Sequence, residues 1–133
     1  MERMGTDNCF ICGLNNPAGL HLNVEEGEGW AKTTWTIEES YVGYENILHG
    51  GIIAAILDDL MSHATYSMKV DALTVHLELD YKASAYVGET IVCEAFVESY
   101  SGRRSIKTAG RIRRGYTLIA EAKGVLVIVE KSK

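Results

Sequence analysis

The sequence predicts an α+β fold in which one long helix packs on a curved antiparallel sheet. Residues 49–69 carry apolar side chains at three- and four-residue spacing, which is the period of an amphipathic helix. From Asp71 onward the period changes to two, as in a strand with one buried face. Because a lone helix must cover its apolar stripe against a sheet, we predict the order β-β-α-β-β-β-β.

Two short strands are predicted before the helix. Residues 20–26 and 29–38 contain β-favouring side chains on either side of the glycine-rich turn "EGEG". The chain has a single proline, Pro17, and no low-complexity linker or repeat divides it. We therefore expect one domain that spans residues 1–133.

The helix is predicted to begin just after His49. Its apolar residues recur on one side and form a broad stripe that should face the sheet. The members of this stripe are Ile52, Ile53, Ile56, Leu57, Leu60, Met61 and Ala64.

Four strands are predicted after the helix, at residues 73–82, 90–99, 104–113 and 117–130. The turn-forming segments "SAYVGE", "SYSGRR" and "RRGY" separate them, so we expect four successive strands joined by hairpins. The buried face of the first strand is expected to comprise Leu73, Val75, Leu77, Leu79 and Tyr81.

The last strand is apolar on both faces. Both faces of this strand must therefore be buried. In so small a domain, we expect another subunit to bury the second face. Val125, Val127 and Val129 lie on one face, and Leu126 and Ile128 lie on the other.

The composition argues against a nucleic-acid-binding, membrane-spanning or secreted protein. At 133 residues and 47% hydrophobic residues, the chain is long enough for one core, and its net charge of −5 argues against general nucleic-acid binding. No segment approaches the roughly 20 apolar residues of a membrane span, and the start lacks a secretion signal. We expect a cytoplasmic protein with no nucleic-acid or membrane partner, and its three cysteines are expected to be reduced.

Two aspartates interrupt the apolar run of the helix. Asp58 lies roughly 145° from the centre of the stripe and therefore points away from the helix's own core. Its neighbours on that face are small, which suits close approach of another backbone or a narrow ligand slot; an ordinary solvent-facing aspartate is the alternative. Those neighbours are Gly51, Ala54, Ala55, Ser62 and Thr65.

Asp59 and His63 form an i, i+4 pair that can meet on the helix surface. No third metal ligand stands at a suggestive spacing, so we expect a surface or interface ion pair rather than a metal site. Cys9 and Cys12 form a CxxC pair, which supplies only two ligands unless two subunits pool their pairs. We expect a structural loop with free thiols and no metal.

Gly50 and Gly51 stand where the helix begins. The first N–H groups of a helix have no internal acceptor and carry the positive end of the helix dipole. A ligand oxygen can approach them closely at glycine, and a carboxylate two turns further along the same face could attack the bound carbonyl or activate water. The alternative is that the glycines merely ease a tight loop into the helix.

Three stretches of the sequence together resemble a known family. The stretch "HGGIIAAILDD" after "YVGYENIL", with the opening "CFICGLNNPAGLHL", resembles the hotdog-fold acyl-CoA thioesterases of the phenylacetate-pathway, or PaaI-like, type. The resemblance covers nearly the whole chain. It rests on an HGG motif, here residues 49–51, and on an aspartate nine residues after the histidine, here Asp58.

The resemblance implies hydrolysis of an acyl-CoA or acyl-carrier thioester at a site shared between two subunits of a homodimer or a dimer-of-dimers tetramer. It implies Asp58 as general base or nucleophile, the Gly51 N–H as the group that polarises the thioester carbonyl, and His49 as a residue that shapes the turn and can touch substrate. No cofactor is expected. Several relatives carry an asparagine where this chain has Gly43, which leaves Asn46 as the available amide.

An anionic CoA would need basic residues. Six of the 13 basic residues fall between Glu98 and Glu121, where no acidic residue occurs. Arginine suits phosphate because its planar fork donates two hydrogen bonds at once. We single out Arg103 and Arg104, at a turn, with Gly50 as substrate-binding residues; a solvated outer sheet face is the alternative. On the strand, one face should present Arg103, Lys107, Arg111 and Arg113, opposite Ile106 and Ile112.

Two other functions compete with hydrolysis. A hotdog hydratase or dehydratase would need an acid/base pair, but Asp58 and His63 lie about 140° apart around the helix. A non-catalytic acyl-CoA-binding module would gain little from a carboxylate beside an anionic ligand. The sequence therefore favours a thioesterase.

Overall fold

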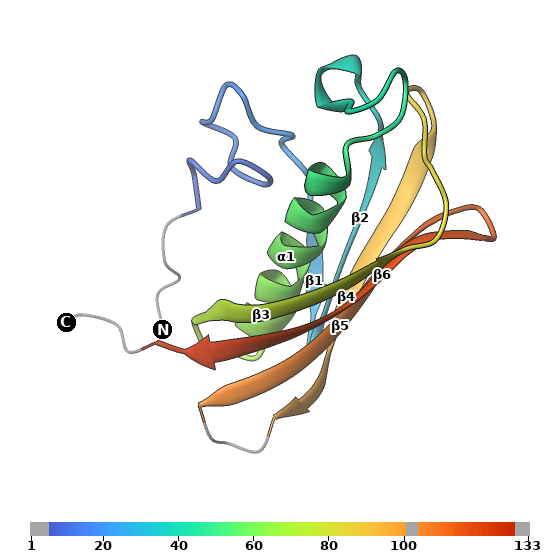
Figure 1. Ribbon diagram of the computed structural model, residues 1–133. Coiled ribbons are helices and arrows are strands. Elements are labelled where there is room, and N and C mark those ends of the chain that lie inside the picture. The colour runs from blue at the N-terminus through green and yellow to red at the C-terminus, as the bar shows by residue number, and fades with distance from the viewer. Residues whose placement is uncertain (1–5, 101–103, 130–133) are drawn as a thin grey trace.

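The structure is a computed structural model that describes residues 6–100 and 104–129, and it consists of one helix packed on a six-stranded antiparallel sheet (Figure 1). The predicted fold class and the predicted order of strands and helix are confirmed. The elements are β1 (Glu25–Gly27), β2 (Trp30–Thr36), a short 3₁₀ turn η1 (Glu39–Tyr41), α1 (Gly50–Tyr66), β3 (Ala72–Tyr81), β4 (Thr90–Tyr100), β5 (Ser105–Arg114) and β6 (Thr117–Ile128).

The first strand is shorter than predicted. Residues 20–23 pair with the N-terminal segment instead of the sheet, because Leu20 N–H donates to Phe10 O and Leu22 N–H donates to Ile11 O. In Figure 1 this segment (blue) lies beside α1, on the side away from β4 and β5. One side of the helix therefore faces the sheet and another faces an irregular segment.

The predicted hairpin between β3 and β4 is wrong. The strand order is β1-β2-β4-β5-β6-β3, so β3 pairs with β6 at the far edge. The physical reason is that β2 occupies the outer edge of β4, from Trp30 opposite Phe96 to Thr36 opposite Thr90. Residues 82–89 cross from β3 at the edge to β4 inside the sheet and are held by loop hydrogen bonds such as Leu48 N–H to Ala85 O.

The core lies between α1 and the sheet. The predicted stripe is buried except for Ile52, which is partly exposed. Two glycines of the sheet let the helix approach closely, since a Cβ at Gly124 would lie 2.7 Å from Met61 Sδ and a Cβ at Gly110 would lie 3.0 Å from Leu57 Cδ2. The strands contribute Ile91, Ile106, Ile112, Ile119 and Leu126 to this core.

The predicted buried face of β3 is only partly correct. Leu77 and Leu79 are half-buried, but Leu73 is 56% exposed and Val75 is 61% exposed. A bulge between Thr74 and His76 breaks the alternation, so Thr74 takes the inward position. Tyr81 is also exposed, although its hydroxyl contacts the start of α1.

The final strand is covered from one side within this chain. Leu126 is fully buried under α1, whereas Val125 and Val127 are half-buried on the opposite face. A second subunit over that face stays a prediction. Among the described residues, no helix has the length and apolar character needed to cross a lipid bilayer.

Candidate active site

The start of α1 is capped by His49. Its backbone is extended, with φ −62° and ψ 132°, and its Nδ1 accepts a hydrogen bond of 2.8 Å from the Gly51 N–H. On the other side of the turn, the Tyr81 hydroxyl donates to Gly50 O at 2.8 Å. The HGG motif is thus fixed between its own histidine and the end of β3.

An open pocket of about 590 Å³ lies beside this helix terminus. One wall comes from the N-terminal segment and the other from η1, the loop after it and the first turn of α1. Tyr41 joins the two walls, because its hydroxyl donates to Gly19 O at 2.9 Å. The lining residues are Phe10, Pro17, Ala18, Ser40, Tyr41, Val42, His49, Gly51 and Ile52.

Asp58 points from α1 toward β3 and is partly buried. Its Oδ1 accepts a hydrogen bond of 2.5 Å from the Thr74 hydroxyl. A carboxylate held by a short hydrogen bond is fixed in direction, as a catalytic carboxylate must be. Thr74 was missed by sequence reasoning, because regular alternation placed it on the outer face of β3 and no residue signal marks the bulge at Val75.

The structure does not bring Gly51 and Asp58 together within one chain. They are seven positions apart in the α-helix, which corresponds to about 10 Å along the axis between their backbones. A thioester carbonyl that receives a hydrogen bond from the Gly51 N–H is therefore out of reach of the Asp58 carboxylate of the same chain.

Asn46 lies in the exposed loop before the helix, where its carbonyl accepts a hydrogen bond from Val87 N–H. The position at which relatives carry an asparagine is close to the helix start, since a Cβ at Gly43 would lie 3.1 Å from His49 Cδ2. A side chain at residue 43 would contact His49 directly. In this chain that contact is absent because residue 43 is glycine.

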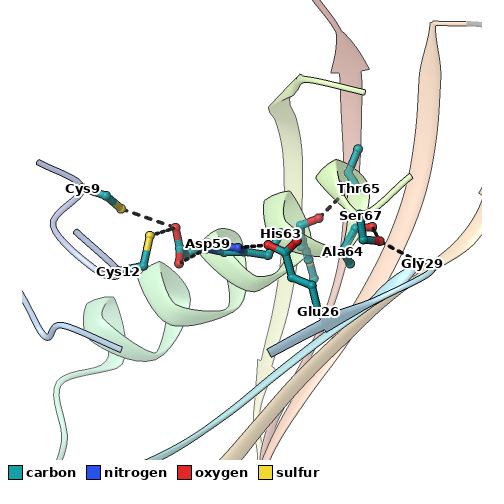
Figure 2. Close-up of polar contacts among 10 residues, drawn as sticks. Cys9, Cys12, Glu26, Gly29, Asp59, His63, Ala64, Thr65 and Ser67 are labelled. Atoms are coloured by element: carbon teal, nitrogen blue, oxygen red, sulfur yellow. Dashed lines mark hydrogen bonds and ion pairs between the residues drawn. The ribbon is translucent and has the colours of Figure 1, made fainter. Parts of the chain in front are cut away.

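Asp59 lies on another side of α1 and faces the N-terminal segment (Figure 2). Its Oδ1 is 3.4 Å from Cys9 Sγ and 3.6 Å from Cys12 Sγ. The predicted contact with His63 is confirmed at 3.4 Å between Nε2 and Oδ2, but this pair is mostly buried instead of lying at the surface. On its other nitrogen, His63 contacts Glu26 of β1.

The three cysteines have free thiols. Burial, followed by the negative charge of Asp59, raises the pKa of the Cys12 thiol. Burial also raises the pKa of Cys93, to about 12. Neither of these thiols has the lowered pKa of a catalytic nucleophile.

The basic residues of β5 are largely paired. Arg111 Nε lies 2.7 Å from Glu94 Oε1, and Arg113 Nε lies 3.4 Å from the same oxygen. Burial alone would raise the pKa of Glu94, but the hydrogen bond and charge of Arg111, and then those of Arg113, outweigh it and lower that pKa. The predicted alternation is confirmed for Lys107 and Arg111, which are exposed, and for Ile106 and Ile112, which are buried, whereas Arg113 is half-buried.

Of the two arginines singled out for CoA, Arg103 lies outside the described residues. Arg104 is exposed, and its guanidinium donates to Ile128 O at 3.1 Å. Because Ile128 pairs with Ala72, Arg104 lies at the same end of the sheet as Thr74, two strands away. This end is remote from His49, which lies at the end of the helix that contacts Tyr81.

Comparison with known proteins agrees with this fold. The profile of the Thioesterase superfamily matches residues 45–119, more than half of the chain. A protein from Archaeoglobus fulgidus named "Putative esterase" is 29% identical over 108 residues, covering 81% of this chain and 70% of that protein.

Two solved structures show the same architecture. The PaaI protein of the E. coli phenylacetic acid degradation operon superposes with a TM-score of 0.75 at 20% identity, covering 81% of this chain and 83% of that one. A hypothetical thioesterase from Streptococcus pneumoniae, crystallised with coenzyme A, superposes with a TM-score of 0.77 at 14% identity, covering 84% and 88%. The chain belongs to the Thioesterase superfamily and has the PaaI-like hotdog fold, in which one helix is packed on a six-stranded antiparallel sheet.

Proposed function

We propose that this protein hydrolyses acyl-CoA thioesters to the free acid and CoA, with Asp58 as the catalytic carboxylate. The observation that carries the proposal is the hydrogen bond from Thr74 to Asp58, on a helix face of small residues, in a chain of the Thioesterase superfamily. The S. pneumoniae thioesterase has been crystallised as an aspartate-to-alanine variant and as a threonine-to-alanine variant. Those two residues are 16 positions apart in that chain, as Asp58 and Thr74 are here.

In this mechanism, Asp58 acts on the thioester carbonyl carbon. As a general base it takes a proton from a water molecule whose oxygen attacks that carbon; as a nucleophile it attacks directly and forms an anhydride that water then cleaves. In either case the C–S bond breaks and CoA leaves as a thiolate that gains a proton. Thr74 is a positioning residue that holds the carboxylate in direction.

The Gly51 N–H is proposed to stabilise the oxyanion that forms on the carbonyl oxygen. In the structure this N–H donates to His49 Nδ1. The substrate oxygen therefore replaces the His49 ring as its acceptor, and His49 turns toward the pocket, where it can contact the acyl group or the thioester. Gly50 leaves room for this approach. Asn46, in the loop before the helix, is the amide proposed to help position the substrate or the water.

We also propose that the site forms between two subunits. The helix rise separates Gly51 from Asp58 by about 10 Å, so each carbonyl requires Gly51 from one chain and Asp58 from the other. β3 is an edge strand that exposes Leu73 and Val75, as expected of a strand that pairs with a second copy. A homodimer satisfies both features, and a dimer of dimers contains the same unit.

Coenzyme A is the proposed carrier of the acyl group, with Arg103 and Arg104 as the residues that receive its phosphates. The CoA-bound structure of the S. pneumoniae relative supports this choice. Arg111, Arg113 and Arg114 are less suited to phosphate, because Glu94 and Glu89 already neutralise them. This role can be tested by replacing Arg103 and Arg104 together with glutamine, which should raise KM for acyl-CoA more than it lowers kcat.

The main test is thiol release from short, long and aromatic acyl-CoAs, with wild type and Asp58→Asn measured side by side. We expect hydrolysis of at least one class by wild type and a loss of about 10²–10⁴-fold in kcat for the variant, the usual contribution of a general base. Circular dichroism of both proteins controls for folding. Full activity of Asp58→Asn would exclude the proposed role, whereas binding of CoA esters without any turnover by wild type would favour the acyl-CoA-binding module.

Mixing two inactive variants tests the shared site. Asp58→Asn and Gly51→Pro each damage a different half of it, and proline is tolerated in the first turn of a helix. Subunits exchanged at random between the two should recover about a quarter of wild-type activity, because half of the dimers are mixed and each has one intact site. No recovery despite demonstrated exchange would place both groups in the same chain's site.

The hydratase alternative receives no support from the site. His63 is held between Asp59 and Glu26 on a different side of α1 from Asp58. A dehydration reaction needs acid and base groups that converge on one substrate. Asp58 and His63 do not converge within the chain.

A further inference from the structure

We propose that Cys9, Cys12 and Asp59 bind a zinc-class cation, a divalent ion that accepts thiolate ligands, and that this ion fastens the N-terminal segment to α1. The proposal concerns the side of the helix that the hydrolytic site does not use. It does not rest on the reaction assigned to Asp58.

The donor atoms have the spacing that such an ion requires. The two sulfur atoms and one oxygen atom of Asp59 lie within 4.8 Å of one another. Metal bonds of about 2.3 Å to sulfur and about 2.1 Å to oxygen, at a tetrahedral angle, place the two donors about 3.6 Å apart. The observed Sγ–Oδ1 distances are 3.4 Å for Cys9 and 3.6 Å for Cys12.

The loop between the cysteines has the local structure of a ligand-bearing turn. The Ile11 N–H points at Cys9 Sγ, with 3.4 Å between the nitrogen and the sulfur, and such donors stabilise a metal-bound thiolate. The residue after Cys12 must be glycine, because a Cβ at Gly13 would lie 2.3 Å from Cys9 N. Thiolate ligands select zinc-class ions over magnesium or calcium, which prefer oxygen.

A second layer of side chains orients the carboxylate (Figure 2). Asp59 Oδ1 faces the sulfur atoms, while Oδ2 lies 3.4 Å from His63 Nε2, and His63 in turn contacts Glu26 on β1. The side chains of Asp59 and His63 are only 13% and 8% exposed. A series of buried side chains that contact one another behind a metal ligand usually orients the ligand in protein metal sites.

Three ligands from the chain leave the fourth tetrahedral position for water. The ion would hold residues 6–24, a described segment that forms no helix or strand. Phe10, which lies between the two cysteines in the sequence, lines the pocket beside His49 and Gly51. Pro17 and Ala18, from the same segment, also line this pocket. The ion is therefore a structural fastening for one wall of the pocket.

Metal binding by the tag-free protein of 133 residues tests the proposal. The protein is stripped with a chelator under reducing conditions and then titrated with Zn²⁺ against a chromogenic chelator, and Co²⁺ is used to detect thiolate-to-metal charge transfer. Asp59→Asn and Cys12→Ser remove ligands. Asp58→Asn and Cys93→Ala are matched controls, one a neighbouring carboxylate and the other a cysteine outside the cluster.

We expect one zinc per chain in wild type and in both controls, and at least tenfold weaker binding in Asp59→Asn and Cys12→Ser. His63→Gln should weaken binding by about 10–100-fold, the usual effect of a supporting residue. Zinc should also slow proteolysis within residues 6–24 of wild type but not of Asp59→Asn, which keeps the shape of the side chain.

Two results would overturn the proposal. The first is wild-type protein with reduced thiols that takes up no stoichiometric zinc and gives no cobalt charge-transfer band. The second is zinc affinity in Asp59→Asn and Cys12→Ser that equals that of wild type.

Discussion

Asp58 and Asp59 are adjacent on the same helix, yet the two carboxylates meet different chemistry. Because successive helical residues are rotated by about 100°, Asp58 faces β3 and accepts a hydrogen bond from Thr74, whereas Asp59 faces the N-terminal segment and two thiols. A hydroxyl that donates a hydrogen bond to a carboxylate fixes the direction of the carboxylate, as catalysis requires. Two sulfur atoms beside a carboxylate form a set of metal ligands instead.

The comparison shows why the helix tolerates two acidic residues inside its apolar run. Neither carboxylate is fully buried, and each has partners from a different part of the chain: Asp58 meets the edge strand β3 and Asp59 meets the N-terminal segment. The roles proposed for them should therefore separate on mutation.

The largest effect expected on the Asp58 side, after replacement of Asp58 itself, comes from Thr74→Ala. Without the hydroxyl the carboxylate loses its direction, so kcat should fall about 10–100-fold, or roughly 1.4–2.7 kcal/mol in the barrier. Thr74→Ser keeps the hydroxyl and should retain most of the activity. Equal kinetics for Thr74→Ala and wild type would remove Thr74 from the account, and zinc uptake should be the same in all three proteins.

The position of Thr74 could not be predicted from the sequence. The helix, the strand count and the α+β class followed from periodicity, because burial of one face imposes a period on the residues. A bulge leaves no such pattern, so the alternation of Leu73 and Val75 pointed to the wrong face. The position of β3 within the sheet was missed for a similar reason, since pairing between β3 and β6 depends on which edges β2 leaves open.

The cluster around Asp59 was also beyond sequence reasoning, although each half of it was recognised. The CxxC pair offered two ligands, and the Asp59–His63 pair lacked a third at a suggestive spacing. Only the packing of the N-terminal segment on α1 brings Cys12 next to Asp59, 47 residues away. By contrast, the HGG motif and Asp58 lie within one helix and its cap, where sequence spacing translates directly into geometry.

On the Asp59 side, zinc should stabilise the protein. At a free concentration 100 times the dissociation constant, binding to the folded state alone adds about 2.7 kcal/mol, which for a chain of this size corresponds to a rise of about 10 °C in Tm. Thermal unfolding with zinc and with chelator measures this difference. The rise should persist in Asp58→Asn and disappear in Asp59→Asn; a rise of the same size in both variants would mean that zinc binds elsewhere.

A smaller effect is expected at Glu94, whose hydrogen-bond and ion-pair partners belong to neither the reaction site nor the Cys9–Cys12–Asp59 cluster. Its pKa is lowered in the folded protein, so its pairing with arginine stabilises the fold above the ordinary pKa of 4.5 and is lost as pH falls through the lowered value. Because Arg111 is half exposed, Arg111→Gln should cost at most about 1 kcal/mol at pH 7. Urea unfolding at pH 7 and pH 3 should show that this cost shrinks in acid; a cost that grows in acid would contradict the pairing.

The most direct test of the account measures kcat and bound zinc on the same preparations of wild type, Asp58→Asn and Asp59→Asn. We predict that Asp58→Asn loses turnover by about 10²–10⁴-fold and keeps one zinc per chain, whereas Asp59→Asn loses the zinc and keeps kcat within a few-fold of wild type. Loss of both properties in both variants, or a zinc content that follows Asp58, would contradict the division of roles between the two neighbouring carboxylates.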